Sequence, residues 1–163
     1  MPPKQLQTFR ARTPMDPRRA SLACPCDLMA LIDIAATRAR PALTRRGQGV
    51  NIALYDGPLP VTADFVVVVD ALEAGLLEAS ALSQAGEAIR VAACEDDGDV
   101  VVTIIGCNHV TIPTSWLTID PRLQRIADVA GTAVELLWDI GEGPSVVFRM
   151  PTRRRWGRLA NDR

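Results

Sequence analysis

Three side chains with chemical capacity lie close together in the middle of the chain. Cys107, His109 and Thr111 come directly after Val100–Gly106, an apolar and β-branched run that predicts a buried strand. His109 is the only histidine in the sequence. Because ligands in α/β folds commonly bind beyond the ends of the strands, we expect this segment to form a loop at the rim of a sheet, where a ligand would sit.

A metal site is one chemistry that these residues allow. Cys24 and Cys26, with Cys107 and His109, would supply four nitrogen and sulfur ligands of the kind that zinc prefers. The C-x-C and C-x-H spacings are tight, however, and cysteine is a common buried residue with no further role. A catalytic triad is not supported, because the one histidine lies only two residues from the cysteine beside it. We therefore expect four free thiols and no bound metal.

The composition describes an acidic body with two basic ends. The chain has 163 residues, of which 48% are hydrophobic and few are aromatic, so one domain with a core of Val, Leu, Ile and Ala is expected. Residues 1–26 hold five Lys or Arg and one Asp, residues 152–163 hold five Arg and one Asp, and the segment between them is acidic. No apolar run is long enough to cross a membrane and no signal sequence is evident, so we expect a cytoplasmic protein.

The periodicity of the chain predicts three helices and a sheet after an arm of residues 1–26. Asp27 is expected to cap a helix that ends near Arg46 and is kinked or divided at Pro41. The remaining elements are a strand over 50–54, a helix over 65–83, a hairpin of strands 88–94 and 100–106, a helix over 121–130, and strands over 134–140 and 145–150. This order predicts an α+β fold, a two-layer α/β sandwich whose mixed, mostly antiparallel sheet has its helices on one face.

Several short motifs resemble, in the correct order, those of the histidine-kinase-type ATPase domain of the GHKL or Bergerat superfamily. Cys107–Pro113 resembles the family's D-N-G-P-G-I-P and shares Asn108, Ile112 and Pro113 with it. Ala127–Gly131 is similar to the helix before the last hairpin, and Gly141–Pro151 is similar to the closing G-x-G-T-x-F-x-x-x-x-P. The resemblance covers residues 27–151, between the arm of residues 1–26 and the tail of residues 152–163.

The resemblance also implies that the nucleotide-binding residues have been replaced. In the family, the second Asn of a helical N-L-L-x-N-A motif holds Mg²⁺, and Glu78 stands at that position here. Cys107 replaces the Asp that accepts the adenine amino group, and His109 and Thr111 replace two glycines. The phosphate-binding G-x-G-L-G has no counterpart between Pro113 and Gly131. We therefore expect these four positions to line a vestigial pocket without a cofactor, the alternative being ATP with Mg²⁺ bound through the Glu78 carboxylate.

The function implied is that of a non-catalytic or regulatory member of the family. A pseudokinase of this type would act by protein–protein contact in bacterial two-component or phosphorelay signalling, and the losses favour a protein that is not an enzyme. An atypical histidine kinase or ATPase domain that still binds a nucleotide is the alternative. An anti-sigma-type relative is a third interpretation, but such proteins also bind nucleotide, so the same losses count against it.

The basic tail is the candidate surface for a partner. Arg153, Arg154 and Arg155 precede Trp156, and an exposed aromatic beside arginines is typical of a docking anchor. The partner expected from the resemblance is a response regulator or a histidine kinase. The acidic body argues against a broad nucleic-acid footprint, and no membrane contact is expected. The tail folding back onto the acidic body is the other interpretation of the same residues.

Overall fold

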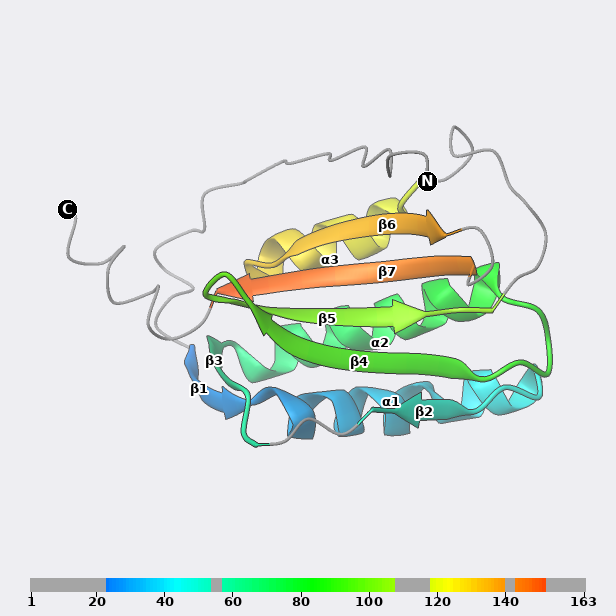
Figure 1. Ribbon diagram of the computed structural model, residues 1–163, viewed down its shortest axis with the longest axis horizontal. Helices are drawn as coiled ribbons and strands as arrows, with labels where there is room; N and C mark the ends of the chain where they lie inside the picture. The colour runs from blue at the N-terminus through cyan, green and yellow to red at the C-terminus, as the bar shows by residue number, and fades with distance from the viewer. Residues whose placement is uncertain (1–22, 54–56, 108–117, 140–142, 152–163) are drawn as a thin grey trace.

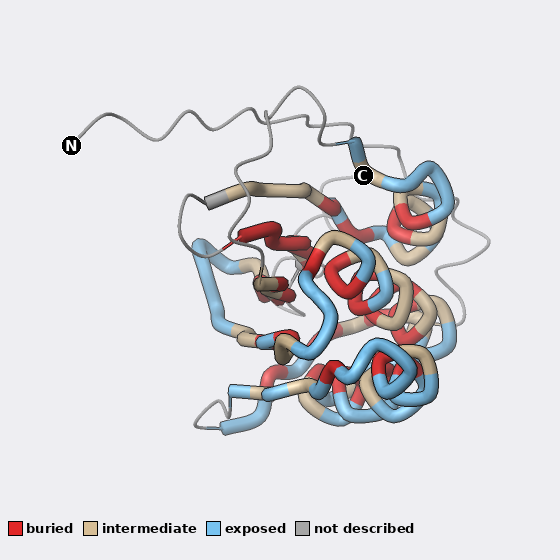
Figure 2. The backbone as a smooth tube through the Cα atoms, turned by 90° about the vertical axis from the view of Figure 1, so that its right-hand side faces the viewer, coloured by how far each residue is buried: buried red, intermediate tan, exposed pale blue. Residues whose placement is uncertain are grey.

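A layer of three helices covers one face of a five-stranded sheet in the structure, a computed structural model that describes residues 23–53, 57–107, 118–139 and 143–151 (Figures 1 and 2). The helices are α1 (Leu28–Arg45), α2 (Phe65–Leu82) and α3 (Pro121–Ala130). The strands, in order across the sheet, are β2 (Val50–Ile52), β4 (Ile89–Asp96), β5 (Asp99–Ile105), β7 (Gly143–Pro151) and β6 (Ala133–Asp139). Among the described strands, only β2 and β4 pair in parallel, so the predicted mixed, mostly antiparallel two-layer sandwich is confirmed.

Each helix begins at an aspartate that satisfies backbone N–H groups of its first turn. The Asp27 side chain accepts a hydrogen bond from the Met29 N–H, and Asp64 accepts from the first turn of α2 in the same way. Asp120 accepts from the Arg122 N–H at 2.7 Å and is followed by a proline in the first turn of α3. All three starts agree with the sequence, because short acidic side chains at these positions replace the hydrogen bonds that a helix lacks at its N-terminus.

The valine run at the start of α2 forms a helix although its residues favour strands. The Asp64 cap and the packing of one face explain this outcome: Val68 and Val69 are buried, whereas Phe65 and Val66 remain exposed. Farther along the same face, Gly75 lies against Phe148 of β7. A Cβ at Gly75 would come within 2.6 Å of Phe148 Cε2, so the missing side chain lets α2 approach the sheet closely.

Two short strands were not predicted. β1 (Cys24–Asp27) and β3 (Pro60–Ala63) pair antiparallel as a separate two-stranded sheet. Residues 24–26, assigned above to the N-terminal arm, therefore belong to the folded body. The Leu28 N–H also donates to the Leu59 carbonyl at 3.0 Å, so this pairing leads directly into α1.

One of the two alternatives expected at Pro41 differs from the structure. α1 is one helix through Pro41 and is not divided there, because Pro41 lies on the exposed side, where water can satisfy the carbonyl that loses its N–H partner. Trp138 is half-buried, because it lies near the end of the edge strand β6. Within the described ranges, no helix has both the length and the hydropathy needed to span a bilayer.

Candidate functional site

Glu78 lies on α2 where this helix meets the start of α3. Its side chain is half-buried, and burial is the larger cause that raises the pKa of its carboxyl above the ordinary value. The negative charge of Asp120, the residue that caps α3, raises the pKa further. The fold therefore places Asp120 near Glu78, and the negative charge of Asp120 disfavours ionisation of the Glu78 carboxyl.

Cys107 lies just beyond the end of β5 and is held by the C-terminal end of α2. Its N–H donates to Ser83 Oγ at 3.1 Å, and its carbonyl accepts from the Gln84 N–H at 2.9 Å. The Ser83 hydroxyl in turn donates to the Ala79 carbonyl at 2.6 Å, one residue beyond Glu78 along α2. The structure thus brings Glu78 and Cys107 to the same end of α2. His109 and Thr111 lie outside the described residues, as do Arg153, Arg154, Arg155 and Trp156.

A buried polar network, which sequence reasoning missed, fixes this end of α2 to the segment after α1. Ser80 Oγ donates to Gln48 Oε1 at 2.5 Å, and Gln48 Nε2 donates to the Gln84 carbonyl at 2.9 Å. Arg46 adds a hydrogen bond of 2.9 Å from its guanidinium to the Ser83 carbonyl. Gln48 and Ser80 are almost fully buried, so these bonds replace water that the side chains lose on folding. No periodic signal marks Gln48, because it follows a helix end and Gly47, a context that predicts an exposed turn.

Several solved structures of histidine kinases and their domains share this architecture. The catalytic domain of histidine kinase ThkA superposes with a TM-score of 0.67 at 15% identity, covering 80% of this chain and 97% of that one. The ATP binding domain of PrrB from Mycobacterium tuberculosis gives 0.63 at 17% identity over 80% of this chain and 98% of that one. Full-length ShkA in complex with AMPPNP gives 0.63 at 20% identity over 86% of this chain and 32% of that one.

The chain has the histidine-kinase-type ATPase fold. No model of a known protein family matches the sequence, and a search of curated proteins found no match either. The likeness at these identities concerns the fold, and the chemistry of the site must be argued from the residues present. In this fold Glu78 occupies α2 and Cys107 the end of β5, the two elements to which the motif resemblance assigned them.

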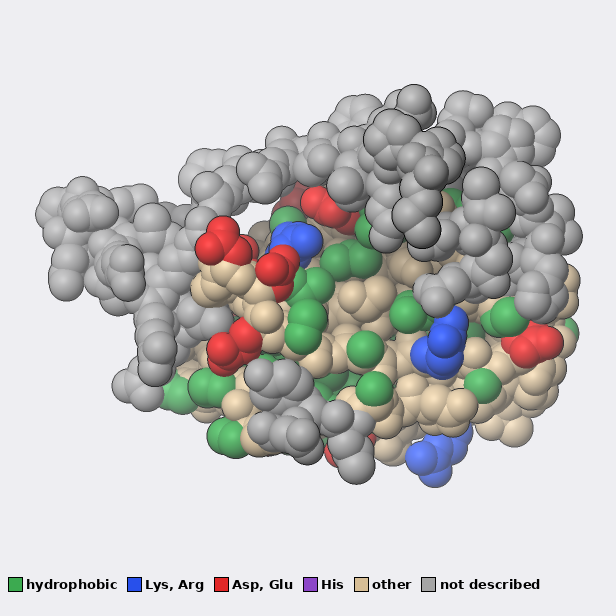
Figure 3. Space-filling model, viewed as in Figure 1, with side chains coloured by type: hydrophobic (Ala, Val, Ile, Leu, Met, Phe, Trp, Pro, Cys, Tyr) green, Lys and Arg blue, Asp and Glu red, His purple; other side chains and the backbone are tan. Residues whose placement is uncertain are grey.

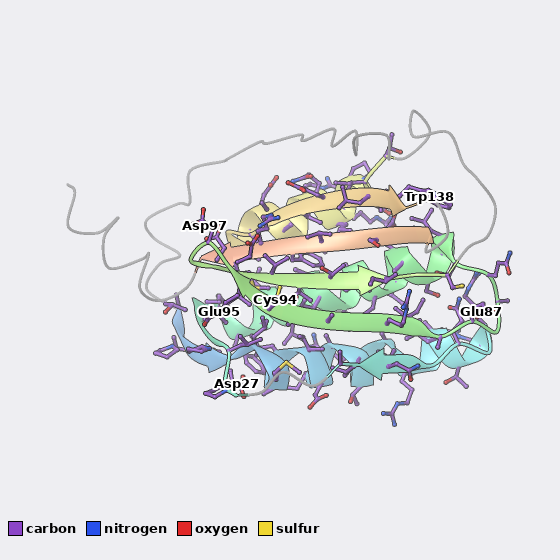
Figure 4. All side chains as sticks on the ribbon, in the orientation of Figure 1. Asp27, Glu87, Cys94, Glu95, Asp97 and Trp138 are labelled. Carbon is purple, nitrogen blue, oxygen red and sulfur yellow. The ribbon has the colours of Figure 1, made fainter. Side chains whose placement is uncertain are left out.

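The four-ligand zinc site considered above is not assembled in this fold. Cys26 Sγ lies 4.0 Å from the Ala63 carbonyl, just before α2, whereas Cys107 is bonded to Ser83, just after α2. An 18-residue helix is about 27 Å long, so Cys107 is far from the other two thiols. Figure 4 shows the same separation, with Asp27, which follows Cys26, at one end of the molecule and Glu87, beyond α2, at the other. In the described part of the chain, no three His, Cys, Asp or Glu side chains are placed to hold a metal.

A cavity of about 370 Å³ lies between α1 and β2 rather than beside Glu78. Its polar lining includes Asp33, Arg40 and Gln48, and none of its lining residues comes from α2 or α3. This cavity is therefore distinct from the surroundings of Glu78 and Cys107.

Proposed function

We propose that this chain is a regulatory, non-catalytic histidine-kinase-like domain that acts through protein–protein contacts in bacterial two-component or phosphorelay signalling. The observation that carries the proposal is the pair of carboxylates Glu78 and Asp120, one of which stands where the family resemblance places the Mg²⁺-holding asparagine. Two negative charges at this position repel a polyphosphate, because like charges at short range repel each other even where solvent partly screens them.

The environment of Cys107 supports the same conclusion. At this position the resemblance places a carboxylate that accepts the adenine amino proton, and a thiol is a weak acceptor. The backbone N–H and carbonyl of Cys107 are hydrogen-bonded to Ser83 and Gln84. The backbone of Cys107 is thus held against the end of α2. Its thiol is a poor substitute for the carboxylate that would accept a hydrogen bond from the adenine amino group.

An atypical nucleotide-binding domain is the second candidate, and Glu78 is the observation that favours it. A carboxylate on a helix can bind Mg²⁺ directly, and a bound cation would reverse the repulsion described above. Isothermal titration calorimetry with Mg-ATP separates the two candidates. We expect no heat of binding at millimolar ATP, with a nucleotide-binding histidine kinase domain as the positive control. Micromolar, Mg²⁺-dependent affinity would establish the second candidate and overturn the first.

The basic tail, residues 152–163, is the proposed site for a response regulator or a histidine kinase. It follows β7, whose last residue Pro151 pairs in register with Asp99 of β5. The hairpin between β4 and β5 exposes Glu95, Asp96 and Asp97, and Figure 3 shows acidic side chains gathered at this end of the open face of the sheet. Pro151, the residue before the tail, therefore lies beside the acidic hairpin, and we propose that attraction of the tail arginines to this hairpin would compete with docking to a partner.

A further inference from the structure

Two thiols lie side by side on β1, in a part of the fold that the proposed function does not use. Cys24 and Cys26 are two residues apart on a strand, so their side chains point to the same face. Their sulfur atoms are 3.4 Å apart. Cys24 is exposed to solvent, and Cys26 is half-buried against the hydrophobic core.

We propose that Cys24 and Cys26 form a reversible disulfide within β1 and act as a thiol–disulfide exchange site. The pair is already close: a disulfide bond is about 2.05 Å long, so the sulfur atoms must approach each other by only about 1.4 Å. Cys107 does not compete, because it lies beyond the far end of α2, and Cys94 belongs to a different strand, β4.

The surroundings of the two sulfur atoms give them different roles. Burial, the contact with Cys24 and the charge of Asp64 raise the pKa of the Cys26 thiol to about 11, so Cys26 remains protonated at neutral pH. Its S–H has the Cys24 carbonyl at 3.3 Å as an acceptor. Cys24 is the exposed thiol, and an incoming disulfide reaches it first.

The reaction balances with a low-molecular-weight disulfide such as oxidised glutathione as the oxidant. The Cys24 thiolate attacks one glutathione sulfur, which forms a mixed disulfide and releases one glutathione thiolate. Cys26 then loses its proton to solvent and attacks the Cys24 sulfur, which closes the intrachain bond and releases the second glutathione. Two electrons pass from the cysteine pair to oxidised glutathione, and the two released protons end on the two glutathione thiols.

Closing the bond must disturb the strand. Two residues apart on an extended strand, Cα atoms are separated by roughly 6.6–7 Å, at the upper limit of what a disulfide allows. Among the described strands, β1 pairs with β3 alone, through Cys24 with Ala63 and Cys26 with Val61, so a bend at Pro25 weakens few of the described hydrogen bonds. The residue after Cys26 is Asp27, which caps α1. Oxidation is therefore expected to loosen β1 from β3 and to reach the start of α1.

The test uses the full chain with Cys94→Ser and Cys107→Ser, so that only the pair on β1 remains. The protein is equilibrated with reduced and oxidised glutathione at several ratios, quenched with acid, alkylated and weighed by mass spectrometry. We expect a monomer whose mass is lower by two hydrogens and that has lost both alkylation sites. Reduction with dithiothreitol should restore the original mass and both alkylation sites. Cys26→Ser should accumulate the glutathione adduct on Cys24, and Cys24→Ser should form its adduct at least about tenfold more slowly.

Amide hydrogen exchange on the same samples measures whether oxidation of Cys24 and Cys26 loosens β1 and the start of α1. The oxidised protein should exchange faster than the reduced protein in residues 24–29, and the Cys26→Ser variant should show no such redox dependence. Disulfide-linked dimers as the sole oxidised product, glutathione adducts that never resolve, or thiols blocked by a bound metal would each overturn the exchange site. Unchanged exchange in residues 24–29 after full oxidation would overturn the coupling to α1.

Discussion

Asp120 at the cap of α3 lies close enough to the Glu78 carboxyl on α2 for its negative charge to raise the pKa of Glu78. The capping role of Asp120 fixes this relationship, because its side chain must accept the Arg122 N–H for α3 to begin there. A residue needed for folding thus sets the electrostatics of the candidate site.

Replacing Glu78 by glutamine should stabilise the protein at neutral pH. The pKa of Glu78 is raised in the folded state, so its contribution to stability is fully present below the ordinary value of 4.5 and is lost as the pH rises through the folded pKa. Glu78→Gln removes this loss. We expect a gain of about 0.5 kcal/mol or less at pH 7, because partial exposure screens the interaction, and no gain below pH 4.5. Urea denaturation at the two pH values measures both.

Asp120→Asn is the matched variant, because asparagine is also a good helix cap but carries no charge. It should reduce part of the pH dependence and leave the part due to burial, which is the larger cause of the raised pKa. A Glu78→Gln variant that is less stable than the parent at pH 7 would contradict this account and would indicate a favourable partner for the ionised carboxylate.

Cys107→Asp alone should not create ATP binding. The substitution supplies the adenine acceptor that the family resemblance implies, but one contact does not replace a phosphate-binding loop, and Glu78 still repels the phosphates. Calorimetry with Mg-ATP should show that the variant and its parent both have a dissociation constant weaker than about 1 mM. This corresponds to less than about 4 kcal/mol of binding free energy. Micromolar affinity in the variant would mean that the phosphate contacts are intact.

Gly75→Ala should destabilise the fold although alanine is the better helix former. Its Cβ would lie 2.6 Å from Phe148 Cε2 and 3.1 Å from Ile104 Cδ1, and both side chains are buried between α2 and the sheet. Overpacking of this kind costs about 1–3 kcal/mol, which exceeds the helix propensity gain of about 1 kcal/mol. Gly49→Ala is the control, since a Cβ there has no neighbour within 4 Å. Chemical denaturation should show a loss for the first variant and a change within about 0.5 kcal/mol for the second.

Gln48→Ala should cost more stability than its position in a turn suggests. The substitution removes the acceptor of the buried Ser80 hydroxyl and the donor to the Gln84 carbonyl. A buried polar group without a partner costs about 1–3 kcal/mol, so we expect a loss of about 2 kcal/mol. Ser80→Ala should cost less, and the double variant should cost less than the sum of the two, because each group is unsatisfied only while the other remains. Additive losses would show that the two side chains do not interact.

The sequence predicted well those elements that depend on interactions between residues close together in the chain, and poorly those that depend on distant residues. Helix starts at Asp27, Asp64 and Asp120 depend on residues two or three positions away, and they are visible in the sequence. β1 and β3 are four residues each and exist because they pair with each other, so neither carries a periodic signal of its own.

The candidate site also combines features that the local sequence predicted with features that depend on tertiary packing. The position of Glu78 on a helix followed from local pattern, and its place in the family motif followed from the resemblance. The proximity of Asp120 to Glu78 was not predicted, because it depends on how α3 packs on α2. The network of Gln48 and Ser80 is also tertiary, and neither residue type predicts burial.

The last prediction concerns the tail of residues 152–163 and requires a partner, which a pull-down followed by mass spectrometry would supply. If the tail docks, its arginines accelerate encounter with an acidic surface, and Trp156 lengthens the lifetime of the complex. Deleting residues 152–163 should slow association about tenfold at low salt and flatten its salt dependence. Trp156→Ala should leave association within about twofold and speed dissociation about tenfold, a difference of about 1.4 kcal/mol.

The acidic hairpin provides the control for this experiment, because its opposite charge would also attract the tail arginines. Neutralising Glu95 and Asp97 with Glu95→Gln and Asp97→Asn removes two exposed charges and leaves the ion pair of 2.9 Å between Arg149 and Asp96 intact. If the hairpin competes for the tail, this double variant should bind the partner faster than the parent, whereas the same changes in the tail-deleted protein should have no effect. Unchanged association and dissociation in the tail-deleted, Trp156→Ala and hairpin variants would place the binding surface on the helices or the sheet rather than on the tail.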